Sequence, residues 1–574
     1  MFSSPAFKRR LESVNVRILK PFVGYVAKNK WLVAAVVYST LLHFIECACN
    51  YSAGTCASLT NPFIQGIWGY LALLGLGLLA GGVPAKILLT VVLAVQTAVG
   101  FLAIFLSAVF ALTLDADAFV VLSASSQQEV REFVSRFYTW KLAVWTVVTL
   151  GAFSAVLWAL WKNQLKRQWP LYAICGILIA PQLINTIRFT VKGDYEDIYK
   201  NNPMFSLVAD FGKFNARMAK LTAMEKDPQP PPNIRYLGED DRLLAIVVIG
   251  ESATRFHHSI YGYPRPTNPM LGAKEIYPFT DVISGYAHTV QSMSYMLSTA
   301  DVEHQEDFRY AMFDVFKAAH FDIRVYSNQA RWDKYSSPTA MLTAHADSRY
   351  YQQEHFANSF DDKLIEEFER RPRKSERPLL AVFHLIGSHT GFEKRTPKDR
   401  KIFSAADRPD SPYKIDDWDD VDEYDNSIRF TDHMLGELVA IVDRHPGPAF
   451  MLYCSDHGEF PEAAQSRPRS GASKDPEYYE IPFVFYANAA YREKYPEVMA
   501  AIRQNLDKAF VTDHFMYPVF TAARITFDGF PYRNDLFSPQ FVPRTNRRLG
   551  NSNVIYRSRK NPYSAPRPKS GKKP

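Results

Sequence analysis

Residues that suit a metal ion follow two apolar stretches of this chain. Residues 244–251 read LAIVVIGE, so Glu251 comes directly after an apolar run and a glycine. Residues 451–459 read MLYCSDHGE, which places Asp456 and His457 side by side after a second run. Carboxylate oxygen and imidazole nitrogen are ligands for Zn²⁺ or Mn²⁺, and sites form where the strands of an open α/β sheet end. We therefore expect a metal site. Alone, Glu251 could instead be a general base or an acidic residue at a helix N-terminus. Asp456 could be a helix-capping residue and His457 a surface histidine.

A possible nucleophile lies between these two segments. Residues 285–301 read GYAHTVQSMSYMLSTAD, and their apolar residues repeat at helical spacing. The pattern predicts a helix that begins near His288 or Thr289. A hydroxyl there meets the positive end of the helix dipole, and beside a metal it would lose its proton more easily and could attack as an alkoxide. The backbone N–H groups could bind a phosphate oxygen. Without the other ligands, Thr289 would be an ordinary N-cap.

Two histidines follow a third apolar run. The segment HLIGSHTGF places His384 and His389 at the end of a predicted strand. They could bind phosphate, protonate a leaving group or hold a second metal. A lone histidine is more often a satisfied core residue, but two at one strand end favour a functional role for His389 in particular.

The elements that must position these residues alternate along the second half of the chain. Nearly continuous apolar strands alternating with helical patterns indicate a mainly parallel sheet covered on both faces. The predicted strands are 243–250, 321–327, 379–387, 449–456 and 481–488, and the predicted helices are 363–371, 425–444 and 514–525.

The first third of the chain is strongly apolar and predicts about five transmembrane helices. Each candidate has roughly the 17–25 residues that a bilayer crossing needs. Basic residues crowd before the first span, whereas residues 50–62 carry no charge, so we expect a cytoplasmic N-terminus and an exported C-terminal domain. The candidate spans are 31–49, 63–83, 87–112, 142–161 and 171–188.

Composition divides the chain into five expected parts. The net charge is +7, but without the basic ends the remainder carries about −9, so the chain does not have the charge distribution of a nucleic-acid binder. A disordered tail could be attracted to anionic headgroups or glycans, or could have no partner. The parts are a basic cytoplasmic N-terminus (1–30), a five-helix membrane domain (31–190), an interfacial helix with a proline-rich linker (191–235), a catalytic domain (236–543) and a basic, disordered tail (544–574).

Five cysteines do not form a disulfide framework. Four belong to the membrane region, and only Cys454 lies in the exported domain. Cys49 and Cys56 could pair near the outer face, which the sequence does not decide.

The residues together resemble a known family. The segment IGESATRFHHSIYGYPRPTNP resembles the signature of the bacterial phosphoethanolamine transferases, which are five-span inner-membrane enzymes with a sulfatase- or alkaline-phosphatase-like periplasmic domain. The segments YSNQ, HLIGSHTGF, YDNSIRFTDHML and SDHGE follow in the same order as in that family.

The resemblance implies a role for each matching position. Glu251, Thr289, Asp456 and His457 would bind zinc (Mn²⁺ or Mg²⁺ being less expected), with Thr289 as the nucleophile that takes phosphoethanolamine from phosphatidylethanolamine. His389, with His384, would bind the phosphoryl group or assist proton transfer, and Asn328 would bind substrate. A glycan hydroxyl in the periplasm would then accept the group, on lipopolysaccharide core, lipid A or a periplasmic glucan.

The chain departs from the family in two respects. Members that act on lipid A commonly have a further histidine downstream of SDHGE, and residues 460–482 contain none, which puts a complete second metal site in doubt. The soluble domain also lacks the disulfide-forming cysteines of many members. Both differences favour core heptose, a periplasmic glucan or another surface glycan over lipid A.

Three other functions compete with this interpretation. A lipoteichoic-acid-synthase-like phosphoglycerol transferase would share the spans and the threonine nucleophile, whereas a non-catalytic membrane protein could bind glycan through the same domain. A sulfatase is disfavoured because its nucleophile is expected in a Cys/Ser-x-Pro-x-Arg segment, which the sequence lacks.

Overall fold

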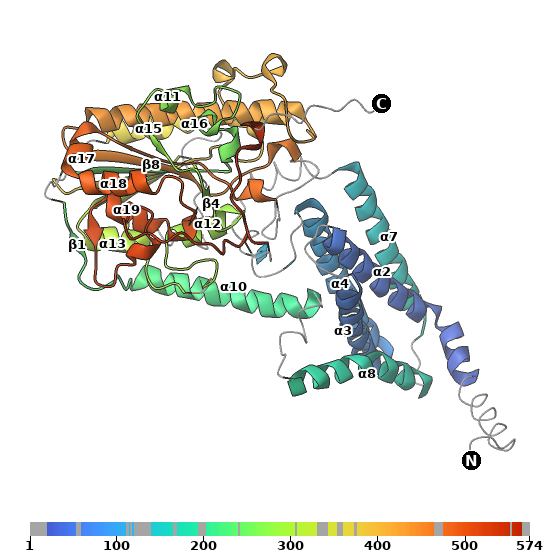
Figure 1. Ribbon diagram of the computed structural model, residues 1–574. Helices are drawn as coiled ribbons and strands as arrows, with labels where there is room; N and C mark the ends of the chain where they lie inside the picture. The colour runs from blue at the N-terminus through green and yellow to red at the C-terminus, as the bar shows by residue number, and fades with distance from the viewer. Residues whose placement is uncertain are drawn as a thin grey trace. The chain divides into compact units, whose positions relative to one another are not determined.

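The chain divides into two compact units, which we describe separately. The first comprises Met1–Phe119 and Gln127–Phe214, and the second contains Asn215–Pro574. The structure is a computed structural model (Figure 1). It describes residues 20–52, 59–110, 114, 118–119, 139–164, 169–192, 203–238, 242–304, 307–329, 343–352, 360–371, 376–463, 475–550 and 554–564.

The first unit contains the five transmembrane helices that the apolar runs predict. All five are long and apolar enough to cross a membrane. Buried polar contacts join two of them, since the Tyr38 hydroxyl lies 2.7 Å from Thr97 Oγ1 and Ser39 Oγ donates to Gln96 Oε1 over 2.8 Å. The helices are α2 (Lys30–Ser52), α3 (Thr60–Leu79), α4 (Gly82–Phe110), α7 (Trp140–Lys162) and α8 (Trp169–Lys192).

The second unit is built on a seven-stranded, mainly parallel sheet, as expected. Its strand order is β3-β9-β8-β2-β7-β5-β6, in which β9 and β3 are antiparallel to their neighbours and the other pairs are parallel. The strands are β2 (Leu244–Gly250), β3 (Tyr277–Pro278), β5 (Asp322–Ser327), β6 (Ser348–Tyr351), β7 (Leu379–His384), β8 (Ala449–Ser455) and β9 (Phe483–Ala487). Two short pairs join β1 (Arg235–Tyr236) to β11 (Ile525–Thr526) and β4 (Val282–Ile283) to β10 (Phe510–Val511).

Helices cover both faces of this sheet (Figure 1). On one face α11, α15 and α16 enclose a core that contains Leu364, Met434 and Leu438. On the other face α12, α13, α18 and α19 enclose a larger core with Met293, Phe316 and Phe520. The helices are α10 (Pro203–Lys226), α11 (Pro269–Gly272), α12 (Thr289–Met296), α13 (Met312–Ala318), α15 (Asp362–Arg370), α16 (Trp418–Arg444), α17 (Ala489–Lys494), α18 (Pro496–Gln504) and α19 (Met516–Ala522).

The register of the three central strands positions the functional site. Every residue of β2 is buried, which explains why its sequence is apolar throughout. In this register Ile249 lies opposite both His384 of β7 and Cys454 of β8, and Gly250 lies opposite Ser455. The residues that follow these strands therefore leave the sheet at the same edge.

Residues 544–550 and 554–564 of the basic C-terminal region pack on the domain, whereas we expected disorder from residue 544. Ion pairs account for this difference. Arg547 lies 2.8 Å from Asp281, and Arg559 lies 2.7 Å from Glu480, so several of the arginines are neutralised internally. Residues 565–574 and Cys56 lie outside the described residues, and the expected domain boundaries stay predictions.

A buried histidine holds several segments of the second unit together. His257 Nδ1 donates to Asp425 of α16 over 2.6 Å, and its Nε2 donates to Glu462 over 3.0 Å. Burial alone would lower the pKa of His257, but the two carboxylates outweigh it and raise the pKa to about 9. Arg265 also binds Asp425, at 2.6 Å. The segment 255–265, which could have been an ordinary loop, is thus part of a charged network.

This network predicts a pH-dependent stability. Because the pKa of His257 is higher in the folded chain than its ordinary 6.5, its contribution is complete below pH 6.5 and is lost as the pH rises through 9. The free energy of unfolding should fall by on the order of 3 kcal/mol over that range. Thermal unfolding in detergent from pH 6 to 9.5 should show this decline. The His257→Gln variant should be less stable than the unaltered protein at pH 6, and its stability should change little with pH. His433→Gln, on the surface of α16, is the control, and parallel curves for all three proteins would contradict the prediction.

Candidate active site

Glu251 is the first residue after β2 and is almost completely buried. Its neighbour Ser252 has a φ of 56°, which is unusual for a residue with a side chain. Three bonds maintain this conformation. Ser252 N donates to Asp456 Oδ1 over 3.1 Å, Ser252 Oγ donates to Glu251 Oε1 over 2.7 Å, and the Tyr424 hydroxyl donates to the Ser252 carbonyl over 2.8 Å. The turn after β2 therefore holds the glutamate toward β8.

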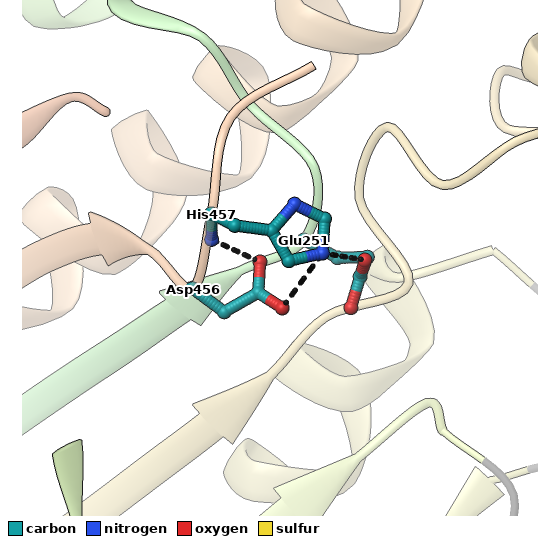
Figure 2. A group of neighbouring side chains, drawn as sticks. All are labelled: Glu251, Asp456 and His457. Carbon is teal, nitrogen blue, oxygen red and sulfur yellow. Dashed lines mark hydrogen bonds and ion pairs between the residues drawn. The ribbon is translucent and has the colours of Figure 1, made fainter. Parts of the chain in front are cut away.

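Asp456 and His457 follow β8 and face Glu251 (Figure 2). The histidine Nδ1 donates to the carbonyl of Gly458 over 2.8 Å, so its Nε2 carries the free electron pair. That Nε2 lies 3.3 Å from Glu251 Oε1 and 3.4 Å from Asp456 Oδ2. Gly458 is required here, because a side chain would place its Cβ 2.1 Å from the carbonyl oxygen of Glu477.

These three residues fit a divalent metal ion. One ligand atom from each lies within 4.8 Å of the others, and all three residues are buried. Asp456 Oδ2 is buried and has no hydrogen-bond partner among the residues that the structure describes. Burial, followed by the charge of Glu251, raises the pKa of Asp456 well above its usual range. Two buried carboxylates side by side are costly without a positive charge between them, so the donor set indicates a cation with oxygen and nitrogen ligands.

Thr289 lies beside the same three residues. It is the first residue of α12, which begins where the sequence predicts. Its Oγ1 is 3.1 Å from Glu251 Oε2, 3.2 Å from Glu251 Oε1 and 3.3 Å from His457 Nε2. Ser284 supports this geometry, because its Oγ donates to the Asp456 carbonyl over 2.6 Å. The hydroxyl is thus held among three ligand atoms at a helix N-terminus.

The two histidines after β7 occupy different environments. His384 is buried, and burial lowers its pKa to about 4 although the charge of Glu251 opposes the shift. It is therefore neutral at pH 7, and its Nε2 has no hydrogen-bond partner in the described residues. His389 is half-buried in the following loop, and its carbonyl accepts a bond from Arg395 Nε at 3.0 Å. Their catalytic and substrate-binding roles stay predictions.

Asn328 and Gln329, which follow β5, contact different parts of the site. The Asn328 amide donates to Asp361 over 2.8 Å and accepts from Gln352 at 3.3 Å. The Gln329 amide instead donates to Glu251 Oε2 over 3.3 Å and to the Leu385 carbonyl over 2.9 Å. Substrate binding by Asn328 stays a prediction. Sequence reasoning did not single out Gln329, whose only signal is its place at a strand end.

A buried aspartate fixes the loop beside Glu251. Asp361 accepts hydrogen bonds from the backbone N–H groups of Ile386 and Gly387, at 3.0 and 2.9 Å. Gly387 has a φ of 47° and packs directly on Glu251, so that an added Cβ would lie 2.9 Å from its backbone N and O. Ser388 N also donates to the Glu251 carbonyl over 2.9 Å. Asp361 therefore supports Glu251, a candidate metal ligand, through this loop.

Comparisons with known proteins show which families and relatives this chain is similar to. The family model named Sulfatase matches residues 244–523. The phosphoethanolamine transferase EptC of Escherichia coli K12 is 22% identical over 566 residues, covering 93% of this chain and 95% of the relative. The phosphoethanolamine transferase EptA of Helicobacter pylori is 25% identical over 367 residues, covering 60% of this chain and 67% of the relative.

Solved structures share the fold. The full-length lipooligosaccharide phosphoethanolamine transferase A of Neisseria meningitidis aligns with a TM-score of 0.63 at 16% identity, covering 89% of this chain and 98% of that one. The periplasmic domain of Escherichia coli EptC, in complex with zinc, aligns with a TM-score of 0.51 at 22% identity, covering 56% and 93%.

The fold and the comparisons thus define a protein with five candidate membrane-spanning helices and a sulfatase-like α/β domain. Within that class, the chain is similar over 93% of its length to a bacterial phosphoethanolamine transferase, in agreement with the resemblance of its signature segments.

Gly387 allows a test of how closely the loop supports the ligand. Gly387→Ala and Gly529→Ala both place a side chain at positive φ, at a cost of about 1–2 kcal/mol. Only Gly387→Ala also meets the backbone of Glu251, whereas nothing lies within 4 Å of the Cβ at Gly529. With Zn²⁺ as the probe, Gly387→Ala should weaken binding about tenfold or more in competition titrations, and Gly529→Ala should not. Equal affinities in both variants would contradict the proposed contact.

The adjacent pair Asn328 and Gln329 gives a second test. Gln329→Ala removes a hydrogen bond to a metal ligand and should weaken Zn²⁺ binding about tenfold. Asn328→Ala removes a bond to Asp361, and so should mainly lower the unfolding temperature. The two quantities are measured by metal titration and by thermal unfolding of the metal-loaded protein. A larger loss of affinity in Asn328→Ala would reverse this assignment.

Proposed function

We propose that this protein transfers phosphoethanolamine from phosphatidylethanolamine to a hydroxyl group of a surface or periplasmic glycan. The observation that carries the proposal is the position of Thr289 Oγ1, within 3.1–3.3 Å of Glu251 and His457 at the start of α12. A hydroxyl so placed can act as a nucleophile once its proton is removed. The similarity to phosphoethanolamine transferases over 93% of the chain supports the choice of group.

Glu251, Asp456 and His457, with Thr289, would hold a zinc ion. The orphaned Asp456 Oδ2 and the accepting Nε2 of His457 are suitable ligand atoms. When bound, zinc supplies Lewis-acid stabilisation of negative charge on phosphoryl and threonine oxygens. The zinc complex of the EptC periplasmic domain supports this choice of metal over Mn²⁺ or Mg²⁺.

The first half-reaction loads the threonine. Thr289 Oγ1 attacks the phosphorus of phosphatidylethanolamine, and the bond from phosphorus to the diacylglycerol oxygen breaks. That oxygen takes a proton and leaves as diacylglycerol. The Thr289 proton passes to a nearby base, for which Glu251 is in hydrogen-bonding position. The neutral His384 would donate a hydrogen bond to the phosphoryl group, and the half-buried His389 would bind the phosphoryl group or supply the leaving-group proton.

The second half-reaction unloads the threonine. A glycan hydroxyl attacks the same phosphorus, its bond to Thr289 Oγ1 breaks, and the threonine regains a proton as the acceptor hydroxyl loses one. The backbone N–H groups at the start of α12 suit the phosphoryl oxygens in both steps. Each half-reaction therefore exchanges one P–O bond for another and needs no further co-reactant.

A location in the inner membrane, with the catalytic domain in the periplasm, suits both substrates. The five spans place the enzyme in the bilayer that contains the donor lipid, and the exported domain would meet glycan acceptors. The acceptor would be lipopolysaccharide core, lipid A or a periplasmic glucan. Phosphoglycerol transfer and a purely glycan-binding role receive less support, because the relatives that span most of the chain are phosphoethanolamine transferases.

Intact mass spectrometry tests the nucleophile and the donor together. The purified protein in detergent, incubated with phosphatidylethanolamine, should gain the mass of one phosphoethanolamine group and release diacylglycerol. Thr289→Ala should gain none, because no other hydroxyl replaces Thr289 Oγ1. Thr280→Ala, at an exposed position outside the site, should load like the unaltered protein.

Two results would contradict the proposal. A mass gain that persists in Thr289→Ala would assign the nucleophile elsewhere. A gain of phosphoglycerol from phosphatidylglycerol, with none from phosphatidylethanolamine, would replace the donor and select the lipoteichoic-acid-synthase-like alternative.

A further inference from the structure

A basic segment directly follows the loop after β7 that contains His389. Residues 393–401 read EKRTPKDRK, with five basic and two acidic residues among nine. We call this stretch the basic segment. It contains most of the 3₁₀ helix Phe392–Lys394 and all of the 3₁₀ helix Lys398–Arg400, and it connects β7 to the elements that precede α16. It therefore begins at the edge of the sheet where the site lies.

Specific bonds hold both ends of the basic segment. Arg395 turns back to the loop, where its Nε donates to the His389 carbonyl over 3.0 Å and its guanidinium donates to the Thr390 carbonyl over 2.6 Å. Beyond the far end, the backbone N–H groups of Ile402 and Phe403 donate to Asn426 of α16 over 2.8 and 2.9 Å. The segment thus keeps a defined position next to His389.

Two side chains of the basic segment remain available to a ligand. Lys401 is paired with Glu423 at 2.7 Å, and Arg395 donates its hydrogen bond to the His389 carbonyl. Lys398 and Arg400 are exposed, and neither has an ion pair within the described residues. A free ammonium and a free guanidinium on one short turn are suitable partners for a phosphate group.

The charge of the surroundings makes this pair distinctive. Residues 236–543 carry about −13 in total, so an anionic molecule would be repelled by much of the domain. Ordered arginines of the basic C-terminal region are directed inward, since Arg544 pairs with Asp513 at 2.6 Å and Arg547 pairs with Asp281 at 2.8 Å. The exposed positive charge of Lys398 and Arg400, next to the loop that contains His389, is therefore available to an anionic ligand.

We infer that Lys398 and Arg400 bind a phosphate group already present on the acceptor glycan. This inference rests on the proposed function, because it concerns the molecule that unloads Thr289. An acceptor with a phosphate near its reacting hydroxyl would be anchored by the basic segment and approach the site beside His389. Exposed charge pairs contribute modestly and are screened by salt, so they govern the binding of the acceptor rather than the chemical step.

The test compares Lys398→Glu/Arg400→Glu with the charge-matched control Lys508→Glu/Arg533→Glu, which lies outside the basic segment. Each full-length protein in detergent is first loaded from phosphatidylethanolamine, and the mass of the Thr289 adduct reports folding and the donor half-reaction. Transfer is then measured to phosphorylated core lipopolysaccharide, to the same material after phosphatase treatment, and to a neutral glucan. The basic-segment variant should raise the KM for the phosphorylated acceptor about tenfold with little change in kcat.

Removal of the acceptor phosphate should abolish the difference between the two variants, and so should 0.5 M salt. Equal KM values for both variants with the phosphorylated acceptor would overturn the inference. An equal rise in KM for the phosphorylated and the dephosphorylated acceptor would also overturn it. A defect confined to loading of Thr289 from vesicles rich in anionic lipid would overturn it as well, and would assign the basic segment to the membrane surface. Failure of the unaltered protein to form any adduct would instead overturn the proposed function, so the two failures are distinguishable.

Discussion

Two carboxylates buried beside each other are the constraint on which the rest of the site depends. The parallel pairing of β2 with β8, with Gly250 opposite Ser455, brings Glu251 and Asp456 together in the centre of the domain. Burial and then their mutual repulsion raise the pKa of Asp456, and the pair is costly unless a cation lies between the two carboxylates. The fold therefore builds an anionic site before any substrate arrives, and the imidazole of His457 completes its ligand set. A hydroxyl placed beside that cation, as Thr289 is, becomes the natural reacting group.

The surroundings of the site maintain conformations that the chain would not adopt by itself. Ser252 and Gly387 both have positive φ, and both contact Glu251, one along the chain and one across the sheet. Tyr424 supports the first and Asp361 the second, each through hydrogen bonds to backbone atoms. Glu251 is thus held between two turns at positive φ, and hydrogen bonds from buried polar groups offset the backbone strain at Ser252. None of these supporting residues needs to touch a substrate, yet the position of the metal depends on them.

The sequence predicts the parts of the structure in which an apolar run or a helical spacing ends or begins at residues with suitable chemistry. Apolar runs that end in Glu251 or in Asp456 and His457 predict both the strands and the ligands, and the helical spacing predicts the start of α12. Residues that act through distant contacts leave no such pattern. Asp361 lies 25 and 26 residues before the N–H groups it binds. Gln329 and Asn328 are adjacent and chemically alike, and only the alternation of side chains after β5 decides which one reaches Glu251. The basic C-terminal region has the composition of a disordered tail, and only its acidic partners elsewhere in the fold show that part of it is ordered.

An enzyme with one phosphoryl site and two unlike substrates must separate chemistry from recognition. On the proposed function, Glu251, Asp456, His457 and Thr289 would act on a group that the donor and acceptor complexes share. They could therefore distinguish neither a lipid from a glycan nor one glycan from another. Discrimination must come from elements outside the ligand set. For the donor, the transmembrane helices supply it by residence in the bilayer. For the acceptor, it must come from the soluble domain near His389, where the loops after the strands vary without disturbing the sheet. The basic segment has this position, and its exposed charges could change between relatives while the site that it borders stays the same.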